Sequence, residues 1–153
     1  MDRPLQLFPL LDSLIAQHLI CAESRQRFTH EVPGEHPLET IASLHLDDLR
    51  HPGRRLDLDS LCQWLAQQAG QPFLRLDPLS IDLPGMTGLM SAAFARRHAI
   101  LVVAQSADSI TVASAEPWVG AWETDLAQVL KRRVVRVLAS PLGIRQISQD
   151  FFR

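Results

Sequence analysis

The segment from His45 to His51 holds the densest group of side chains that could bind a metal ion. It has a histidine at each end and the carboxylates of Asp47 and Asp48 between them. Imidazole and carboxylate groups are common ligands of zinc and other divalent metals. The spacing matches no known metal-binding pattern, however, and the Pro and Gly residues that follow are typical of a solvated loop. We therefore predict a surface loop here rather than a metal site.

Motifs for enzymatic catalysis do not occur in the sequence. There is no phosphate-binding loop of the form GxxxxGK[ST], and the only lysine, Lys131, has no glycine near it. Serines are plentiful, but none lies in the G-x-S-x-G pattern of a nucleophile elbow. The sequence therefore predicts no catalytic, metal-binding or cofactor-binding residues, and no ATP hydrolysis by this chain.

Two pairs of side chains are candidates for a partner interface. Trp118 and Trp122 are four positions apart around a predicted helix start, where an exposed aromatic pair would anchor a protein partner. Packing of these rings in the core is the interpretation that we favour. Arg96 and Arg97 belong to a basic run at a predicted helix end, where cations interact well with the helix dipole. For this run, an anionic ligand or an acidic partner is the alternative.

The composition is that of an ordinary globular domain. Its 153 residues are 46% hydrophobic and 21% charged, with a net charge of −2. Because this charge predicts no strong attraction to polyanions, nucleic acid is not an expected partner. No apolar run reaches the length of about 18 residues that a membrane span needs, and the start lacks a signal-peptide pattern. We therefore expect a cytoplasmic protein without direct membrane insertion, in which Cys21 and Cys62 are buried thiols.

Residues 1–70 are predicted to form short helices, because apolar residues recur there at helical spacing. The predicted helices span residues 7–19, 22–31, 37–44 and 58–69. Pro9 is compatible with the first turn of its helix, Pro37 is a favourable first residue, and Gly70 ends the last helix.

Two of these helices are similar in sequence. Residues 11–19 align without gaps with residues 38–46, at an offset of 27 positions. An internal duplication would produce this likeness. Amphipathic helices also resemble one another by chance, so both interpretations stay open.

Residues 71–153 change to a mixed pattern of short apolar runs and helical periodicity. The predicted order is a strand at 73–76, a Pro- and Gly-rich passage at 78–88, a helix at 89–97, a hairpin of 100–104 and 110–114, a helix from Trp122, a strand at 134–138 and a last helix from Ser140 and Pro141. The predicted fold class is therefore α+β. A helical subdomain over 1–70, with a possible degenerate repeat, precedes an α/β subdomain over 71–153 with a three- to four-stranded sheet flanked by helices.

Four segments have the strongest likeness to a known family. They are 66–78 (AQQAGQPFLRLDP), 94–101 (FARRHAIL), 110–117 (ITVASAEP) and the pair Trp122-Glu123 with Leu138-Ala139-Ser140-Pro141. In this order and spacing they resemble the N-terminal domains of type II secretion and type IV pilus assembly ATPases. The resemblance is clear over 73–153 and faint over 5–70.

The resemblance implies a non-catalytic regulatory and docking domain, cut off before the motor domain of a parent ATPase. The parent would bind ATP and magnesium, whereas this chain would bind neither. The implied partners are the motor domain and the cytoplasmic domain of an inner-membrane secretion or pilus assembly protein. The expected location is therefore the cytoplasm, at the inner face of the inner membrane.

Some members of this family also bind cyclic di-GMP, through two repeats that begin with Arg-Leu-Gly and contain a later Gly-Leu. The matching positions here are Pro9-Leu10-Leu11 with His18-Leu19, and His36-Pro37-Leu38 with His45-Leu46. The hydrophobic residues match, but the Arg and Gly positions do not. We therefore expect weak or no binding of cyclic di-GMP, with a cyclic di-GMP receptor as the alternative function.

Overall fold

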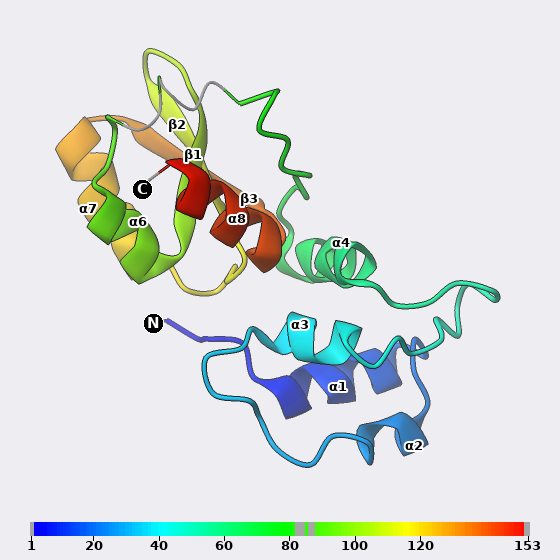
Figure 1. Cartoon of the computed structure of the whole chain (residues 1–153). Helices are drawn as coiled ribbons and strands as arrows, with labels where there is room; N and C mark the ends of the chain where they lie inside the picture. Colours follow the sequence, from blue (N-terminus) through cyan, green and yellow to red (C-terminus); the bar gives the residue numbers. More distant parts are fainter. Residues whose placement is uncertain (1, 82–84, 86–87, 152–153) are drawn as a thin grey trace. The chain divides into compact units, whose positions relative to one another are not determined.

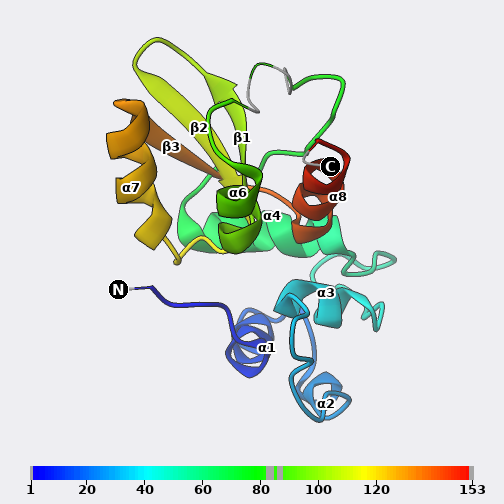
Figure 2. The same ribbon diagram turned by 60° about the vertical axis from the view of Figure 1, so that its left-hand side comes forward.

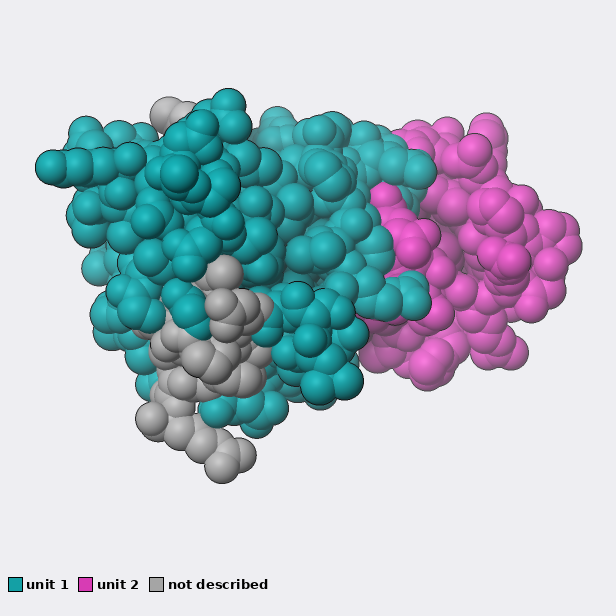
Figure 3. All heavy atoms as spheres, turned by 90° about the horizontal axis from the view of Figure 1, so that it is seen from above, with its two compact units in different colours: residues 1–3, 64–153 teal, residues 4–63 magenta. Residues whose placement is uncertain are grey.

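The structure of the chain, a computed structural model, describes residues 2–81, 85 and 88–151 (Figures 1 and 2). The chain forms two compact units, which are coloured separately in Figure 3. One unit is made of residues 4–63, and the other is made of residues 1–3 together with residues 64–153. The division falls inside helix α4 (Leu58–Ala69), whose end is the boundary predicted from the sequence.

Helix α1 (Leu7–Ala16) is amphipathic and packs against α2 and α3 within the first unit. Its apolar residues recur every three or four positions and form one buried face. The buried residues are Leu7, Leu10, Leu11 and Leu14. Pro9 is the third residue of the helix, where a backbone N–H would have no partner inside the helix. The prediction of a helix that tolerates this proline is confirmed.

The prediction of a long second helix is wrong, because α2 spans only Ala22–Arg25. None of its residues is buried. Without an apolar stripe, packing cannot stabilise further turns, and a four-residue helix has little stability of its own. Cys21, which precedes α2, is exposed, so the prediction of two buried thiols holds only for Cys62 in α4.

Helix α3 (Pro37–Ala42) begins at the predicted proline. The two segments that align in sequence, 11–19 and 38–46, also share their local geometry. His18 and His45 occupy equivalent positions, and both have left-handed backbones with φ of 62° and 50°. The equivalent apolar residues are all buried: Leu11, Leu14 and Leu19 in one segment, and Leu38, Ile41 and Leu46 in the other. Such shared geometry agrees with a duplication, which itself stays a prediction.

The second unit is built on a three-stranded sheet in the order β1-β2-β3. Strands β1 (Ile100–Gln105) and β2 (Ser109–Ser114) form the predicted hairpin, which pairs Ile100 with Ser114 and has a bulge between Val102 and Ala104. Strand β3 (Arg133–Leu138) runs parallel to β2. The predicted α+β class is confirmed, with three strands.

Helices cover both faces of this sheet (Figures 1 and 2). Helix α8 (Pro141–Phe151) covers one face, where Ile144 and Ile147 pack with residues of all three strands. Helices α6 (Ala92–His98) and α7 (Ala121–Leu130) cover the other face. Side chains that alternate along each strand supply the two cores.

The predicted strand at 73–76 is wrong, because only one bridge forms there, between Phe73 and Leu138. Leu138 N–H donates to Pro72 O and Leu138 O accepts from Leu74 N–H, both at 2.8 Å. Beyond this point, the partly buried Leu74 and Leu76 pack against the α8 face of the sheet, so side-chain packing replaces strand pairing.

Helix α6 begins three residues later than predicted, because Ser91 is its N-cap and accepts a hydrogen bond from Phe94 N–H at 3.1 Å. Of the Pro- and Gly-rich passage before it, residues 82–84 and 86–87 lie outside the described residues.

Candidate functional site

The candidate site is built on the connection between β2 and α7, which Arg136 of β3 holds in place. Side chains alternate along β3, so Arg136 points to the same face as Val134, which packs in the core beneath α7. Its Nη2 atom donates to the carbonyl oxygens of Glu116 at 3.1 Å and Val119 at 3.0 Å. A third bond, at 3.3 Å, reaches Ser114 Oγ. Arg136 therefore supplies donors for backbone carbonyls of a connection that has no regular secondary structure.

The environment of Arg136 is unusual for a cation, because only 13% of its side chain is exposed. Its guanidinium lies over the ring of Trp122 at 4.9 Å from the centroid, and the buried Nε has no hydrogen-bond partner among the described residues. Burial lowers the pKa of Arg136, while the negative charges of Glu123 and Asp2 oppose the shift. The charged form is thus favoured by carboxylates close to this guanidinium.

Gly120 leaves room for the close approach of this guanidinium. A Cβ atom at position 120 would lie 3.0 Å from Nη1 of Arg136 and 3.5 Å from Oε2 of Glu123. Gly120 is also the N-cap of α7, and as a glycine it provides no side-chain acceptor for the first N–H groups of the helix. This helix end is therefore able to receive an acceptor from elsewhere.

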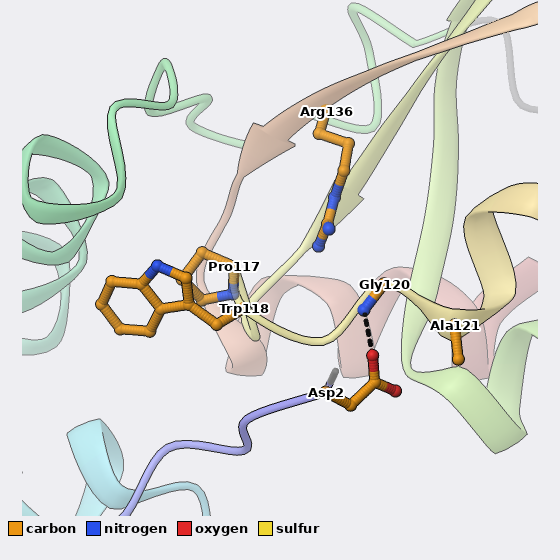
Figure 4. Close-up of a pocket in the computed structure, with 6 residues that line it drawn as sticks. All are labelled: Asp2, Pro117, Trp118, Gly120, Ala121 and Arg136. Atoms are coloured by element: carbon orange, nitrogen blue, oxygen red, sulfur yellow. Dashed lines mark hydrogen bonds between the residues drawn. The ribbon is translucent and has the colours of Figure 1, made fainter.

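A hollow of about 670 Å³ lies at this helix end (Figure 4). It is lined by Asp2, Pro117, Trp118, Gly120, Ala121 and Arg136, all from the same unit. Asp2 comes from the N-terminal segment, and its Oδ1 accepts a hydrogen bond from Gly120 N–H at 3.0 Å. Figure 4 shows the Asp2 carboxylate pointing at Gly120, with Arg136 descending from β3 toward the same connection.

The next residue, Arg3, binds the same connection through backbone and side chain. Its N–H donates to Trp118 O at 3.0 Å, and its guanidinium lies 5.0 Å from the centroid of the Trp118 ring. Trp118 therefore presents both a carbonyl and an aromatic face to the N-terminal segment.

The four residues predicted for a partner interface are separated by the structure. Trp122 is buried in the core at 2% exposure, whereas Trp118 is half-buried and lines the hollow. Helix α7 begins at Ala121, so Trp118 precedes it and the two rings do not share a helix face. Arg96 and Arg97 are exposed in the last turn of α6 and do not line the hollow.

Arg136, Gly120 and Asp2 are not among the residues predicted for a functional site. Arg136 lies in a strand that begins with another arginine, and a charged residue in such a pattern is usually solvated. Asp2 is separated from Gly120 by 118 positions, so no local pattern connects them. Of the three, only Gly120 could have been suggested by the sequence, because a glycine just before a predicted helix can indicate that another group approaches the backbone closely there.

The segment of His45–His51 contains one close pair of potential ligands. His51 Nδ1 lies 2.8 Å from Asp48 Oδ2, and Asp48 Oδ1 accepts a hydrogen bond from Arg50 N–H at 3.0 Å. Among the described residues, no group of three or more His, Cys, Asp or Glu side chains could hold a metal ion. Within residues 2–81, 85 and 88–151, no helix is long and apolar enough to cross a membrane.

A helical unit joined to a three-stranded sheet with helices on both faces is a fold seen in two solved structures. The N-terminal domain of XpsE aligns over 100% of both chains with a TM-score of 0.56 and 12% identity. MshE, solved with cdg (cyclic di-GMP), aligns over 93% of this chain and 97% of its own with a TM-score of 0.56 and 18% identity. Identities this low show the fold alone, which is that of the XpsE N-terminal domain.

Sequence comparison shows the family. Residues 69–153 match the MshEN domain. Over 119 residues the chain is 33% identical to the type IV pilus assembly ATPase TfpB of Acinetobacter baylyi. This alignment covers 77% of the chain and 20% of the relative. The chain thus spans about a fifth of that relative's length. It belongs to the MshEN family, the N-terminal domains of type II secretion and type IV pilus ATPases, and the predicted resemblance is confirmed.

Proposed function

We propose that this chain is a regulatory and docking domain, which links an ATPase motor domain to the cytoplasmic domain of an inner-membrane secretion or pilus assembly protein. Membership of the MshEN family supports this role. In this role the domain works in the cytoplasm, at the inner face of the inner membrane, through its partner. The observation that carries the proposal is the half-buried Trp118, which borders a hollow instead of joining the core.

Binding of the purified cytoplasmic domain of the cognate assembly protein, measured by titration calorimetry, tests this role. Trp118→Ala should weaken binding by about 2 kcal/mol or more if the indole is an interface anchor. Val129→Ala is the matched control, because Val129 on α7 is 77% exposed and does not line the hollow. The docking role is overturned if the wild-type chain does not bind, and the choice of Trp118 is overturned if both variants bind equally.

We also propose that the chain itself hydrolyses no ATP, although its parent would bind ATP and magnesium. Phosphoryl transfer needs a loop of backbone N–H groups around the phosphates and a lysine beside them. Here the only lysine, Lys131, is the C-cap of α7. Phosphate release by the purified chain should stay at the background rate. Turnover that persists at constant specific activity through further purification would contradict the proposal.

A receptor for cyclic di-GMP is the second candidate function, and the likeness to MshE, solved with cdg, favours it. The residues at the matching positions argue against strong binding. Leu11 and Leu38, which replace the glycines, are both fully buried side chains at 0% exposure. His36 replaces an arginine, and its Nδ1 accepts a hydrogen bond from Leu38 N–H at 3.1 Å. One of the two ring nitrogens of His36 is therefore used within the helix cap.

We propose that cyclic di-GMP binds weakly or not at all. Loss of a charge-assisted hydrogen bond costs about 1.5–3 kcal/mol, so loss of one in each repeat would weaken a micromolar ligand about a hundredfold or more. Titration calorimetry with cyclic di-GMP measures this directly. A dissociation constant in the low micromolar range would contradict the proposal and favour the receptor function.

A further inference from the structure

Asp2 and Arg3 contact the rest of their own unit, residues 64–153, in the way that a short peptide contacts a receptor. Both are exposed, and neither belongs to a helix or a strand. They are held by two hydrogen bonds of 3.0 Å, from Arg3 N–H to Trp118 O and from Gly120 N–H to Asp2 Oδ1. Because the segment keeps its exposure while it makes these contacts, another segment of similar chemistry could take its place.

The receptor side of this contact is polar and held in place. Arg136 fixes the carbonyls of Glu116 and Val119, and the turn between them is closed by a hydrogen bond of 3.1 Å from Val119 N–H to Glu116 O. Its groups are thereby set before any ligand arrives, which lowers the entropy cost of binding. Such a surface is suited to a defined short sequence.

The chemistry of the hollow selects a carboxylate followed by a cation. Gly120 N–H and the positive end of the α7 dipole favour a negative group, and the guanidinium of Arg136, which has Glu123 3.8 Å from its Nη1, adds a positive group nearby. Trp118 offers a carbonyl to the backbone N–H of the next residue and an aromatic face to its cationic side chain. Free anions would use only the first of these features, so a peptide fits the site better.

We propose that this hollow is a binding site for an extended segment of a partner protein, with an Asp followed by Arg or Lys, and that residues 2–3 of this chain occupy it when no partner is bound. The proposal gives a chemistry to the docking surface and so rests on the proposed docking function. The chain's own segment is an intramolecular competitor, because it belongs to the same polypeptide as the site. A partner segment must therefore displace it, and weakening the internal contact strengthens binding of the partner.

The experiment uses the whole chain and a fluorescently labelled, N-terminally acetylated peptide with the sequence Asp-Arg-Pro-Leu-Gln-Leu of residues 2–7. Fluorescence anisotropy measures its binding to the wild-type chain and to the double variant Asp2→Ala/Arg3→Ala, in which both changes are at exposed positions. The double variant should bind the peptide at least about tenfold more tightly than the wild type, because the internal competitor is removed.

Two controls and one spectroscopic measurement make this result specific. A peptide with Asn and Ala in place of Asp and Arg should bind the double variant at least about tenfold more weakly, because it lacks both charged groups. Adding Trp118→Ala to the double variant should weaken binding of the charged peptide severalfold, because the aromatic face for its cation is lost, while the circular dichroism spectrum stays that of the folded chain. The amide resonance of Gly120 should shift on addition of the charged peptide only.

The proposal is overturned if the wild type and the double variant bind the peptide equally, if neither shows saturable binding, or if the neutral peptide binds as well as the charged one. Failure of this site is separate from failure of the docking function. An assembly protein that binds the chain while the peptide does not would overturn the site and leave docking intact. Peptide binding without binding of the assembly protein would overturn the docking function and leave the peptide site intact.

Discussion

Arg136 shows how one buried cation can organise a connection between two elements. Three hydrogen bonds, an aromatic contact with Trp122 and a carboxylate from Glu123 meet at its side chain. A lysine could not reproduce this arrangement, because it lacks the flat guanidinium that lies over the Trp122 ring and places Nη1 3.8 Å from Glu123 while Nη2 binds the three acceptors. The alternating pattern of β3 predicts the strand correctly, but it does not indicate that this arginine is buried.

The two tryptophans should respond differently to truncation. Trp122 is 2% exposed, so Trp122→Ala should lower the free energy of unfolding by about 3–5 kcal/mol through lost burial and an internal cavity. Trp118→Ala removes a half-buried ring and its contact with Arg3, and should cost about 1 kcal/mol or less. Urea unfolding followed by circular dichroism measures both. Equal losses would show that Trp118 also supports the core.

Cys62 makes stability depend on pH in the alkaline range. Burial, with further effects from Asp59, Glu39 and Asp57, raises the pKa of the thiol from 9.0 to about 12. The folded state therefore favours the neutral thiol. Its contribution to stability is complete below pH 9.0 and should fall as pH rises from there toward about 12, by about 1.4 kcal/mol per pH unit.

Comparison with Cys62→Ala isolates this effect, because all other titrating groups are shared by the two proteins. The stability difference between wild type and variant should shrink between about pH 9 and pH 11. A difference that stays constant over this range would contradict the raised pKa of Cys62.

In the native chain, Ellman's reagent near neutral pH should react with the exposed Cys21 and leave the buried Cys62 intact.

At the scale of elements, helix α7 ends with a residue in a strained backbone conformation. Its C-cap, Lys131, has φ of 53° and ψ of 43°, a left-handed geometry that glycine adopts without a steric cost. Lys131→Gly should therefore raise the free energy of unfolding by about 0.5–1 kcal/mol. Lys131→Ala is the matched control, since it removes the side chain but keeps the strain, and should give no gain. Equal effects of the two substitutions in thermal unfolding would refute the argument.

The elements that sequence analysis predicted well are those with a strong local period. The hairpin, α7 and the terminal helix all have apolar residues spaced to match their own geometry, so burial and propensity agree. The strand predicted at 73–76 fails because its apolar residues serve side-chain packing, while only Phe73 forms a bridge. The long second helix fails because none of the residues of α2 is buried, so side-chain packing does not stabilise further turns.

At the scale of the whole molecule, the α+β class follows from the order of these periods along the chain. The candidate site does not, because it depends on contacts between residues far apart in sequence. Asp2, Gly120 and Arg136 come together only after β3 has paired beside β2 and α7 has packed over them. Trp118 is the member of the site that its residue type alone could suggest, since half-buried tryptophans are frequent in interfaces.

Strand β3 lies at the edge of the sheet, and this position has a consequence for the behaviour of the protein in concentrated solution. Among the described residues, only Leu138 pairs with another segment on the outer side of β3, through the bridge to Phe73. An unpaired strand edge is a template for the edge of a second molecule, and positive charges along it oppose such pairing. Val135 on this strand is 36% exposed and adds an apolar side chain to the open edge. Arg133, two residues earlier on the same side of the strand, places a positive charge beside it.

Removal of that charge should therefore change the association state. Arg133→Val should increase the weight-average mass in sedimentation equilibrium as concentration rises, whereas Arg133→Lys should behave as the wild type. Arg97→Val provides a control for added surface hydrophobicity, because position 97 is exposed on a helix, where no backbone groups are open to strand pairing. If Arg97→Val associates as strongly as Arg133→Val, general hydrophobicity and not the strand edge is responsible. On this view the arginine at the start of β3 keeps neighbouring copies of the protein from extending the sheet, a role that matters most wherever many copies are held close together.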